Sequence, residues 1–286
     1  MTRPGGLAAI DTLIGFRSPS DVDRNPVAVK PSHRGEKHPA DYMYRDIPAT
    51  ADPADDDSAV IADTLASMDA NGVGIGLVSL GSAAIAAAER FPDRFVLSTQ
   101  VDANDVVGAV RAIRSDHETH AIRAVSAFPA GTTPQIGLDD AHWYPVYATC
   151  VELGLPFFAT VGVPGPRVPM DAQHVEGIDR VMYDFPELTF VMRHGGEPWA
   201  TLAVKLMVKW PGLHYSTSAF APQHYPPAII DYANTRGVEK VLYGGYHPFA
   251  LELDRIFGEM GDVPFRDHVW EPFLRGNAAR ILRLDP

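Results

Sequence analysis

The sequence predicts an α/β protein whose fold class is a (β/α)8 TIM barrel. Eight short apolar runs alternate with helix-like segments along nearly the whole chain, a pattern typical of parallel strands with helical crossovers. The chain has 286 residues, which is enough for one barrel of about 250 residues. No GxGxxG or GxxxxGKS/T motif follows a strand, and this argues against an open nucleotide-binding sheet. We therefore predict a single domain over residues 1–286.

The predicted strands are short, apolar and nearly free of charge. In chain order they cover residues 7–14, 73–80, 94–101, 121–128, 155–161, 188–194, 213–218 and 240–245. Helices are predicted between and after them. Asp55 to Ser58 offer N-cap side chains for a helix to about Asn71, where Gly72 stops it. The other predicted helices cover residues 83–91, 104–117, 141–153, 170–185, 199–210, 226–236, 251–260 and 273–284.

Residues 16–55 form a long irregular region rich in Pro, Asp and His. A loop of this length without secondary structure is uncommon in a compact domain unless it has a function. We therefore expect a lid-like insertion over one end of the barrel.

Composition limits the function classes. The hydrophobic content of 46% and charged content of 21% are typical of a globular protein. A net charge of -12 argues against binding nucleic acid or an anionic membrane through a basic surface. Cys150 is the one cysteine, so no disulfide forms within the chain, and its apolar context indicates a buried thiol. Without a signal peptide or an apolar run of membrane-spanning length, we expect a cytoplasmic protein with a small-molecule substrate.

Polar residues stand where a barrel would place its chemistry, at the C-terminal ends of the strands and in the loops that follow. Each has a structural interpretation as well. An acid can cap a turn, Ser and Thr can satisfy strand-end backbone groups, and an arginine among prolines and glycines can be a surface charge. The candidates are Asp11, Ser126 with Phe128, Thr160, Arg167, His194 with Glu197, Ser216 with Ser218, and Tyr246 with His247.

His194 is the strongest candidate. It ends an apolar strand and precedes two glycines and a predicted helix, so a titratable side chain meets an open turn. Its imidazole can serve as acid, base or hydrogen-bond donor near neutral pH. A structural role has comparable weight. Glu197 is either a first-turn acid favoured by the helix dipole or a carboxylate of the site.

Five segments, in order and spanning almost the whole chain, carry a family resemblance. They include a first strand with Ile-Asp, a fifth strand leading to a Gly, and a strand leading to His, two glycines and Trp. In these segments the chain resembles the amidohydrolase-related barrels, the branch of the amidohydrolase superfamily that includes aminocarboxymuconate-semialdehyde decarboxylase and γ-resorcylate decarboxylase. The segments are Ile10 to Gly15, Leu155 to Gly162, Phe190 to Trp199, Val241 to Pro248 and Gly276 to Leu282.

The resemblance implies a metal site, but most of its ligands are replaced. The first-strand His-x-His pair corresponds to Leu13 and Gly15, the fifth-strand His to Thr160 and the eighth-strand Asp to Tyr246, so that only His194 is kept. A catalytic zinc needs about three protein ligands, and Leu and Gly offer no lone pair. We predict no metal and no other cofactor. The alternative is zinc in a non-standard site that uses His194 with ligands such as His247 or Asp11.

The resemblance implies hydrolysis or non-oxidative decarboxylation, that is, a hydrolase or a lyase. We predict a metal-independent enzyme of this family that acts on a small carboxylated or amide-containing organic molecule. His194 would be the acid/base, Glu197 would orient the imidazole, and Tyr246 would donate to an oxyanion. The alternative is an inactive homologue that binds a ligand or a partner, and the resemblance also implies a homodimer. The predicted substrate-binding residues are Asp11, Thr160, Arg167, Ser216, Ser218 and His247, with Arg167 anchoring a carboxylate.

Overall fold

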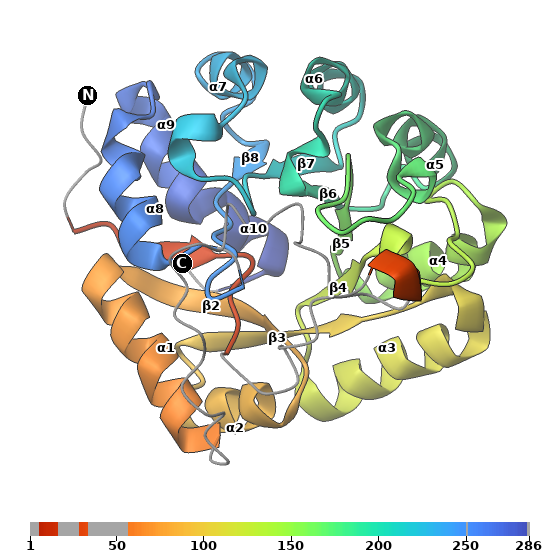
Figure 1. The fold of residues 1–286 in the computed structure, drawn as a ribbon, viewed down its shortest axis with the longest axis horizontal. Coiled ribbons are helices and arrows are strands. Elements are labelled where there is room, and N and C mark those ends of the chain that lie inside the picture. The colour runs from red at the N-terminus through yellow and green to blue at the C-terminus, as the bar shows by residue number, and fades with distance from the viewer. Residues whose placement is uncertain (1–5, 17–28, 34–56, 250, 285–286) are drawn as a thin grey trace.

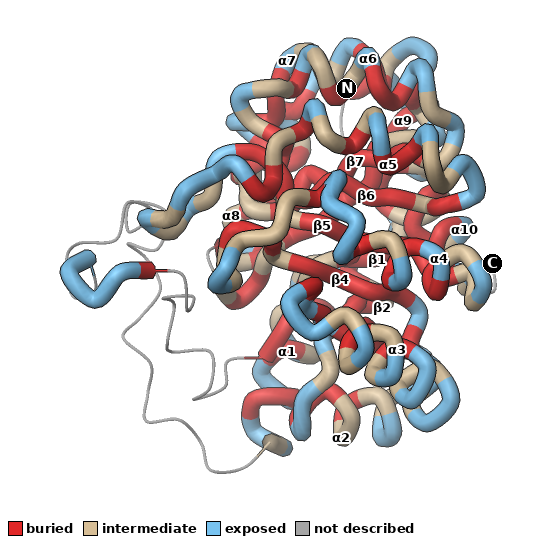
Figure 2. Tube along the Cα trace, turned by 90° about the vertical axis from the view of Figure 1, so that its right-hand side faces the viewer, coloured by how far each residue is buried: buried red, intermediate tan, exposed pale blue. Residues whose placement is uncertain are grey.

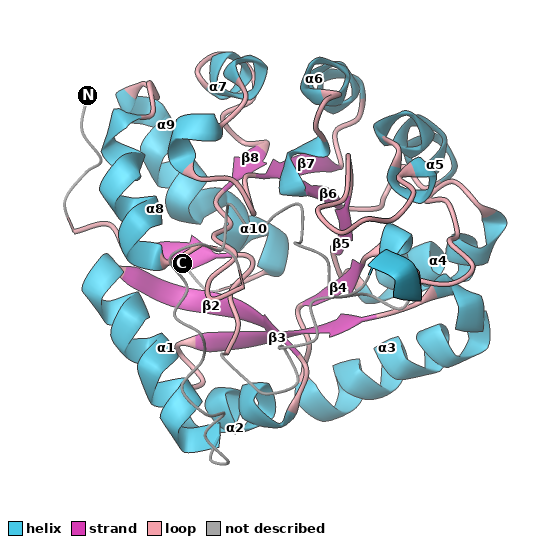
Figure 3. Cartoon of the chain, viewed as in Figure 1, coloured by secondary structure: helices cyan, strands magenta, loops and turns pink. Residues whose placement is uncertain are grey.

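A computed structural model shows eight parallel strands enclosed by an outer layer of helices, which confirms the predicted TIM barrel (Figure 1, Figure 3). The structure describes residues 6–16, 29–33, 57–249 and 251–284, so most of the predicted insertion at 16–55 lies outside the described residues. The strands pair in chain order: β1 (Ala9–Asp11), β2 (Val73–Ser79), β3 (Phe95–Gln100), β4 (Ala124–Ala127), β5 (Phe157–Thr160), β6 (Phe190–Arg193), β7 (Leu213–Ser216) and β8 (Val241–Leu242).

Ten α-helices lie in the described part of the chain. They are α1 (Asp57–Asn71), α2 (Ser82–Arg90), α3 (Val106–His120), α4 (Tyr144–Leu153), α5 (Ile178–Asp184), α6 (Ala200–Lys209), α7 (Pro227–Ala233), α8 (Leu253–Glu259), α9 (Asp267–Glu271) and α10 (Asn277–Leu282). None of the helices in these described ranges is both long and apolar enough to cross a membrane.

Helix ends follow local sequence signals. The Asp105 side chain accepts a hydrogen bond from the backbone N–H of Gly108 and so caps α3. Gly154 ends α4 in the left-handed conformation, with a φ of 63° that a glycine adopts without strain. Asp105 therefore fixes where α3 begins after β3, and Gly154 fixes where the chain leaves α4 and turns into β5.

The strands separate two apolar layers, because successive side chains on a strand point to opposite faces. Residues on the inner face fill the barrel, and residues on the outer face pack against the helices. Figure 2 shows the buried strands at the centre of the molecule. The inner cluster contains Ile10, Leu77, Ala124, Phe158, Val191 and Leu242, and the outer cluster includes Phe157, Phe190 and Met192.

The barrel closes beyond the end of β8, which has only two residues. The backbone N–H of Tyr246 donates to the carbonyl of Leu13 (2.8 Å), and the N–H of Gly15 donates to the carbonyl of His247 (2.9 Å). A parallel bridge joins Ile14 and His247. The segment after β8 therefore completes the ring against the segment after β1.

Helix α10 covers the N-terminal end of the barrel. Its side chains Ala278, Ile281 and Leu282 join the inner apolar cluster. Asn277 donates to the carbonyls of Val238 and Val241 at the start of β8, both at 2.8 Å. Because this end is filled, the open end is the one at which the strands terminate, as in other barrels.

Three predicted elements differ in the structure. The helix predicted over 170–185 is two 3-10 turns, Asp171–Gln173 and Val175–Gly177, followed by α5, because His174 between the turns has an extended backbone. The helix predicted over 273–284 begins as a π-turn before α10, and α9 was not predicted. The strand predicted to end at His194 ends at Arg193, since His194 has a φ of 61°.

Candidate functional site

Backbone strain marks the ends of three successive strands. The non-glycine residues His194, Ala219 and Tyr246, which follow β6, β7 and β8, have φ values of 61°, 68° and 93°. Such conformations cost about 1–3 kcal/mol each and cluster at functional sites. They lie at the open, C-terminal end of the barrel. We therefore place the candidate active site at the mouth formed by β6, β7 and β8.

His194 is held in this mouth by Ser218. Its backbone N–H donates to the Ser218 hydroxyl at 3.2 Å, and its Nδ1 lies 3.2 Å from the same oxygen. If Nδ1 carries the proton, the hydroxyl accepts both bonds and the lone pair stays on Nε2. The ring also packs edge-on against Tyr246, at 4.9 Å between centroids.

Burial lowers the pKa of His194 to about 4, and the positive charge of Arg193 lowers it further, while a hydrogen bond with the backbone of Ser218 acts in the opposite direction. The imidazole is therefore neutral at pH 7. A neutral imidazole can accept a proton and act as a general base. Only the protonated imidazolium can act as a general acid.

Arg193 was missed from the sequence, and it is the main cation at the mouth. It is 6% exposed. Its Nη2 donates to the carbonyl of Thr12 across the barrel at 2.9 Å, and its guanidinium carbon lies 4.6 Å from the ring centroid of Phe158. Burial lowers the pKa of Arg193 to about 10, against the opposing influence of Asp11 and Tyr246, so it stays charged at neutral pH. Strand alternation could have found it, because Arg193 shares a face with the inner residue Val191.

Buried hydroxyls lie below the mouth. The Thr12 hydroxyl donates to the carbonyl of Tyr243 at 2.8 Å and lies 3.3 Å from the Ser216 hydroxyl. A Cβ on Gly244 would lie 2.5 Å from the Ser216 oxygen and 3.1 Å from the Ser218 Cβ. This close packing leaves Ser216 and Ser218 without exposed surface. Their predicted contact with a substrate stays a prediction.

Asp11 and His247 lie where the segment after β8 closes the barrel against β1 and the segment after it. Asp11 is fully buried, and its Oδ1 accepts the backbone N–H groups of Leu13 (2.9 Å) and Gly245 (2.8 Å). Burial raises the pKa of Asp11 to about 6, although these two bonds oppose the rise. His247 is 4% exposed, with Nδ1 2.9 Å from the carboxylate of Glu252. Substrate binding by Asp11 or His247 stays a prediction.

The remaining predicted residues lie around the same end. Thr160 ends β5 and is paired in register with Arg193. Glu197 offers its backbone carbonyl to the N–H of Val163 at 2.8 Å, and no hydrogen bond joins its side chain to His194 in the described residues. Arg167 is an exposed residue of the loop after β5. The orienting contact of His194 comes from Ser218, and the predicted roles of Glu197 and Arg167 stay predictions.

The described residues do not fit a catalytic metal. Nowhere in the described ranges do three or more His, Cys, Asp or Glu side chains gather as a metal site would require. At the first strand, Leu13 and Gly15 provide no donor side chain. The space beside Gly15 is also filled, since a Cβ there would clash with the Phe249 ring.

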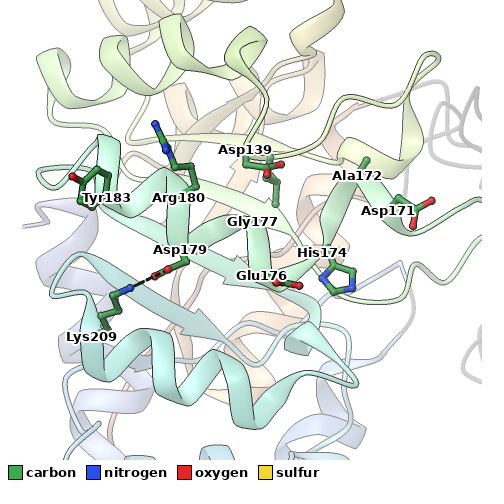
Figure 4. A pocket seen from close by; sticks show the side chains of 11 residues that line it. Asp139, Asp171, Ala172, His174, Glu176, Gly177, Asp179, Arg180, Tyr183 and Lys209 are labelled. Carbon is green, nitrogen blue, oxygen red and sulfur yellow. Dashed lines mark hydrogen bonds and ion pairs between the residues drawn. The ribbon is translucent and has the colours of Figure 1, made fainter.

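A cavity of about 650 Å³ lies elsewhere (Figure 4). It is lined by residues 138–139, which precede α4, by the 3-10 turns before α5, by α5 itself and by Lys209 of α6. In it Lys209 forms an ion pair with Asp179 at 2.7 Å. None of the predicted site residues lines it. Its lining residues are Leu138, Asp139, Asp171, Ala172, His174, Glu176, Gly177, Asp179, Arg180, Tyr183 and Lys209. This cavity is therefore separate from the candidate site at the mouth of the barrel.

Solved structures with the same fold cover nearly the whole chain. An uncharacterised TIM-barrel protein of Bordetella bronchiseptica is 23% identical, with a TM-score of 0.77 over 97% of this chain and 99% of its own. The 2,6-dihydroxybenzoate decarboxylase of Rhizobium is 16% identical, with a TM-score of 0.67 over 98% and 99%. The 5-carboxyvanillate decarboxylase of Novosphingobium aromaticivorans, solved with manganese and 4-hydroxy-3-methoxy-5-nitrobenzoic acid, is 16% identical, with a TM-score of 0.65 over 99% and 98%.

No match was found among curated proteins. The amidohydrolase family profile, in contrast, matches residues 21–284, which is nearly the whole chain. The chain belongs to the amidohydrolase family.

Proposed function

We propose that this amidohydrolase-family protein is an enzyme that acts on a small carboxylated or amide-containing organic molecule at the mouth of the barrel, without a resident metal ion. One observation carries the proposal. His194 is a neutral imidazole, fixed by Ser218 and placed next to the buried cation Arg193. A proton acceptor beside a fixed positive charge is the minimum that acyl or carboxylate chemistry requires.

The family and the related folds support the substrate class. Two structures that share the fold are decarboxylases named for aromatic carboxylic acids, and one of them holds such an acid with manganese. Fold-level likeness is an analogy, because one barrel can host many reactions. The argument for this chain therefore rests on its own residues, above all on the buried Arg193.

The protonation state of His194 favours hydrolysis over decarboxylation. Decarboxylation needs an acid that delivers a proton to carbon as CO2 leaves. Hydrolysis needs a base that takes a proton from water as the water oxygen bonds to the carbonyl carbon. The imidazolium so formed then passes that proton to the leaving alcohol or amine as its bond to the carbonyl carbon breaks. With a pKa of about 4, His194 is a base at pH 7. In this proposal the Tyr246 hydroxyl donates to the developing oxyanion, and Ser218 positions the imidazole.

The same residues support the proposal that the enzyme works without a metal ion. A divalent ion at the mouth would meet the guanidinium of Arg193 in a low-dielectric environment, where like charges repel strongly. The residues at the ends of β1, β5 and β8 also supply few donors. From the family resemblance we add that the protein works as a homodimer, which light scattering after gel filtration would test.

His194→Ala tests the proposal. The variant should stay folded and lose turnover on a panel of small esters, amides and carboxylic acids, while His268→Ala, an exposed histidine of α9, should match the wild type. If the wild type showed no turnover and His194→Ala changed only the ligand affinity, the protein would instead be a binding protein. Metal analysis of protein purified without added metal or chelator checks the second half of the proposal. Stoichiometric zinc or manganese, with activity lost on its removal, would overturn it.

A further inference from the structure

We infer that the guanidinium of Arg193 is the resident cation of the active site, and that it binds the carboxylate of the ligand at the position where a metal-dependent barrel would use its metal ion. The inference rests on the proposed function, since it assumes that the ligand binds at this mouth. It changes the predicted carboxylate anchor from the exposed Arg167 to the buried Arg193.

The first support is the position of the side chain. Arg193 leaves the last residue of β6 and reaches across the barrel to β1, where Nη2 donates to the Thr12 carbonyl at 2.9 Å. On its way the guanidinium lies over the ring of Phe158, an inner residue of β5, at 4.6 Å. Tyr246, after β8, acts on its charge electrostatically. The cation therefore sits among β1, β5, β6 and β8, the strands whose ends hold the metal ligands in the family that the chain resembles.

The second support is that the guanidinium lacks a full set of partners. Its Nε is buried without a hydrogen-bond partner, and no carboxylate of the described residues lies within ion-pair distance of it. Asp11 attracts it from farther away, but the Oδ1 of Asp11 already accepts two backbone N–H groups. A buried cation with unmade bonds is unfavourable until an anion arrives. A carboxylate is well matched, because it can accept several N–H bonds from one guanidinium.

The third support is the chemistry of the neighbouring positions. Leu13 and Gly15 offer no side-chain donor, and Phe249 occupies the space next to Gly15. The residues that remain suit an organic anion held by one side-chain cation. They do not suit a divalent ion, which would be repelled by Arg193.

The test compares two probes of the same shape, benzoate and benzamide, by calorimetry with the wild-type protein. The inference requires benzoate to bind at least about tenfold more tightly, because only benzoate carries the charge that Arg193 would pair with. Equal affinity for the two probes would overturn the inference, and so would the absence of benzoate binding. Neither result depends on the folding of a variant.

Variants then test whether Arg193 is the cation that binds benzoate. Arg193→Gln should reduce benzoate affinity at least about tenfold, and Arg193→Lys, which keeps the charge but loses the planar fork, should fall between it and the wild type. Arg123→Gln, an exposed arginine just before β4 at the opposite end of the barrel, is the matched control and should bind as the wild type does. Unchanged benzoate binding in Arg193→Gln would refute the inference. If His194→Ala still abolished turnover, the proposed function would stand without it.

Discussion

The hydroxyl of Ser218 lies 3.2 Å from the backbone nitrogen of His194 and 3.2 Å from its Nδ1. One side chain after β7 therefore fixes both the backbone and the ring of the residue after β6. Ser218 has no exposed surface, so water does not compete for these contacts. The strained φ of 61° at His194 is held by the same hydroxyl. This pair is the most specific piece of preorganisation at the mouth.

Ser218→Ala should remove the contact that holds the imidazole of His194 in place. We expect kcat to fall about 10–100-fold with little change in KM, because a ring that is misplaced loses its alignment with the substrate. Protein stability should fall by about 1 kcal/mol for the lost hydrogen bonds. NMR of the histidine ring should also show a changed ring environment, because the contact between Nδ1 and the Ser218 hydroxyl is lost. Ser115→Ala, an exposed serine of α3, is the control, and an unaltered His194 signal would contradict the assigned role.

The pH dependence of turnover should follow the deprotonation of His194. A general base works only when it is unprotonated, and the pKa of His194 is about 4. Activity limited by this residue should therefore be flat from neutral pH down to about pH 5 and fall as the pH passes through 4. The measurement is kcat/KM against pH, in parallel with circular dichroism to confirm folding. A midpoint near the ordinary histidine value of 6.5 would show that the catalytic imidazole is solvated.

The contribution of Asp11 to protein stability should fall as the pH rises, which is opposite to the pH dependence of turnover. Its pKa is about 6 in the fold against 3.8 for a free carboxyl, so the native state holds the extra proton between these values. Stability from this group is greatest at low pH and declines as pH rises from about 4 to about 6. At about 1.4 kcal/mol per pH unit, this gap amounts to at most about 3 kcal/mol.

Asp11→Asn isolates that contribution. The amide oxygen can still accept the N–H groups of Leu13 and Gly245, but nothing titrates. Urea unfolding at pH 4.5 and pH 7 should show a smaller loss of stability in Asp11→Asn than in the wild type. Asp11→Ala, which removes both hydrogen bonds, should cost about 2 kcal/mol or more at either pH. An identical pH slope in Asp11→Asn and the wild type would refute the raised pKa.

Gly195 should resist substitution. It has a φ of 81°, and a Cβ there would lie 2.6 Å from the Phe220 ring. Gly195→Ala should therefore lower the free energy of unfolding by about 1–3 kcal/mol, from the left-handed backbone and the displaced ring. Gly258→Ala is the matched control. Its Cβ would meet nothing within 4 Å on the exposed side of α8, so it should raise stability by about 0.5–1 kcal/mol. Thermal melting of both variants makes the comparison, and equal melting temperatures would contradict it.

Local patterns carried most of the fold. Most strands of the barrel are short, largely apolar runs, and their alternation with helices predicts the parallel topology. The helix predicted over 170–185 failed because periodicity does not detect the extended backbone at His174, which divides the segment into two 3-10 turns. The π-turn before α10 likewise depends on packing against β1 and β8 rather than on composition.

The candidate site was predictable only where a side chain acts close to its own strand end. The glycines after His194 identified that residue. Arg193 was missed because its partners, Thr12 and Phe158, belong to strands distant in sequence, and an arginine beside an apolar strand usually marks a surface. Ser218 was found, but as a substrate contact, since the approach of β7 to β6 cannot be read from the spacing.

The position of α10 has a consequence for synthesis. Because Ala278, Ile281 and Leu282 complete the interior packing of strands made much earlier, the nascent chain cannot exclude water from its barrel until these last turns have left the ribosome. The segment that seals β8 to β1 also comes late. We therefore expect nascent chains that still lack α10 to expose the inner residues of β1 to β7.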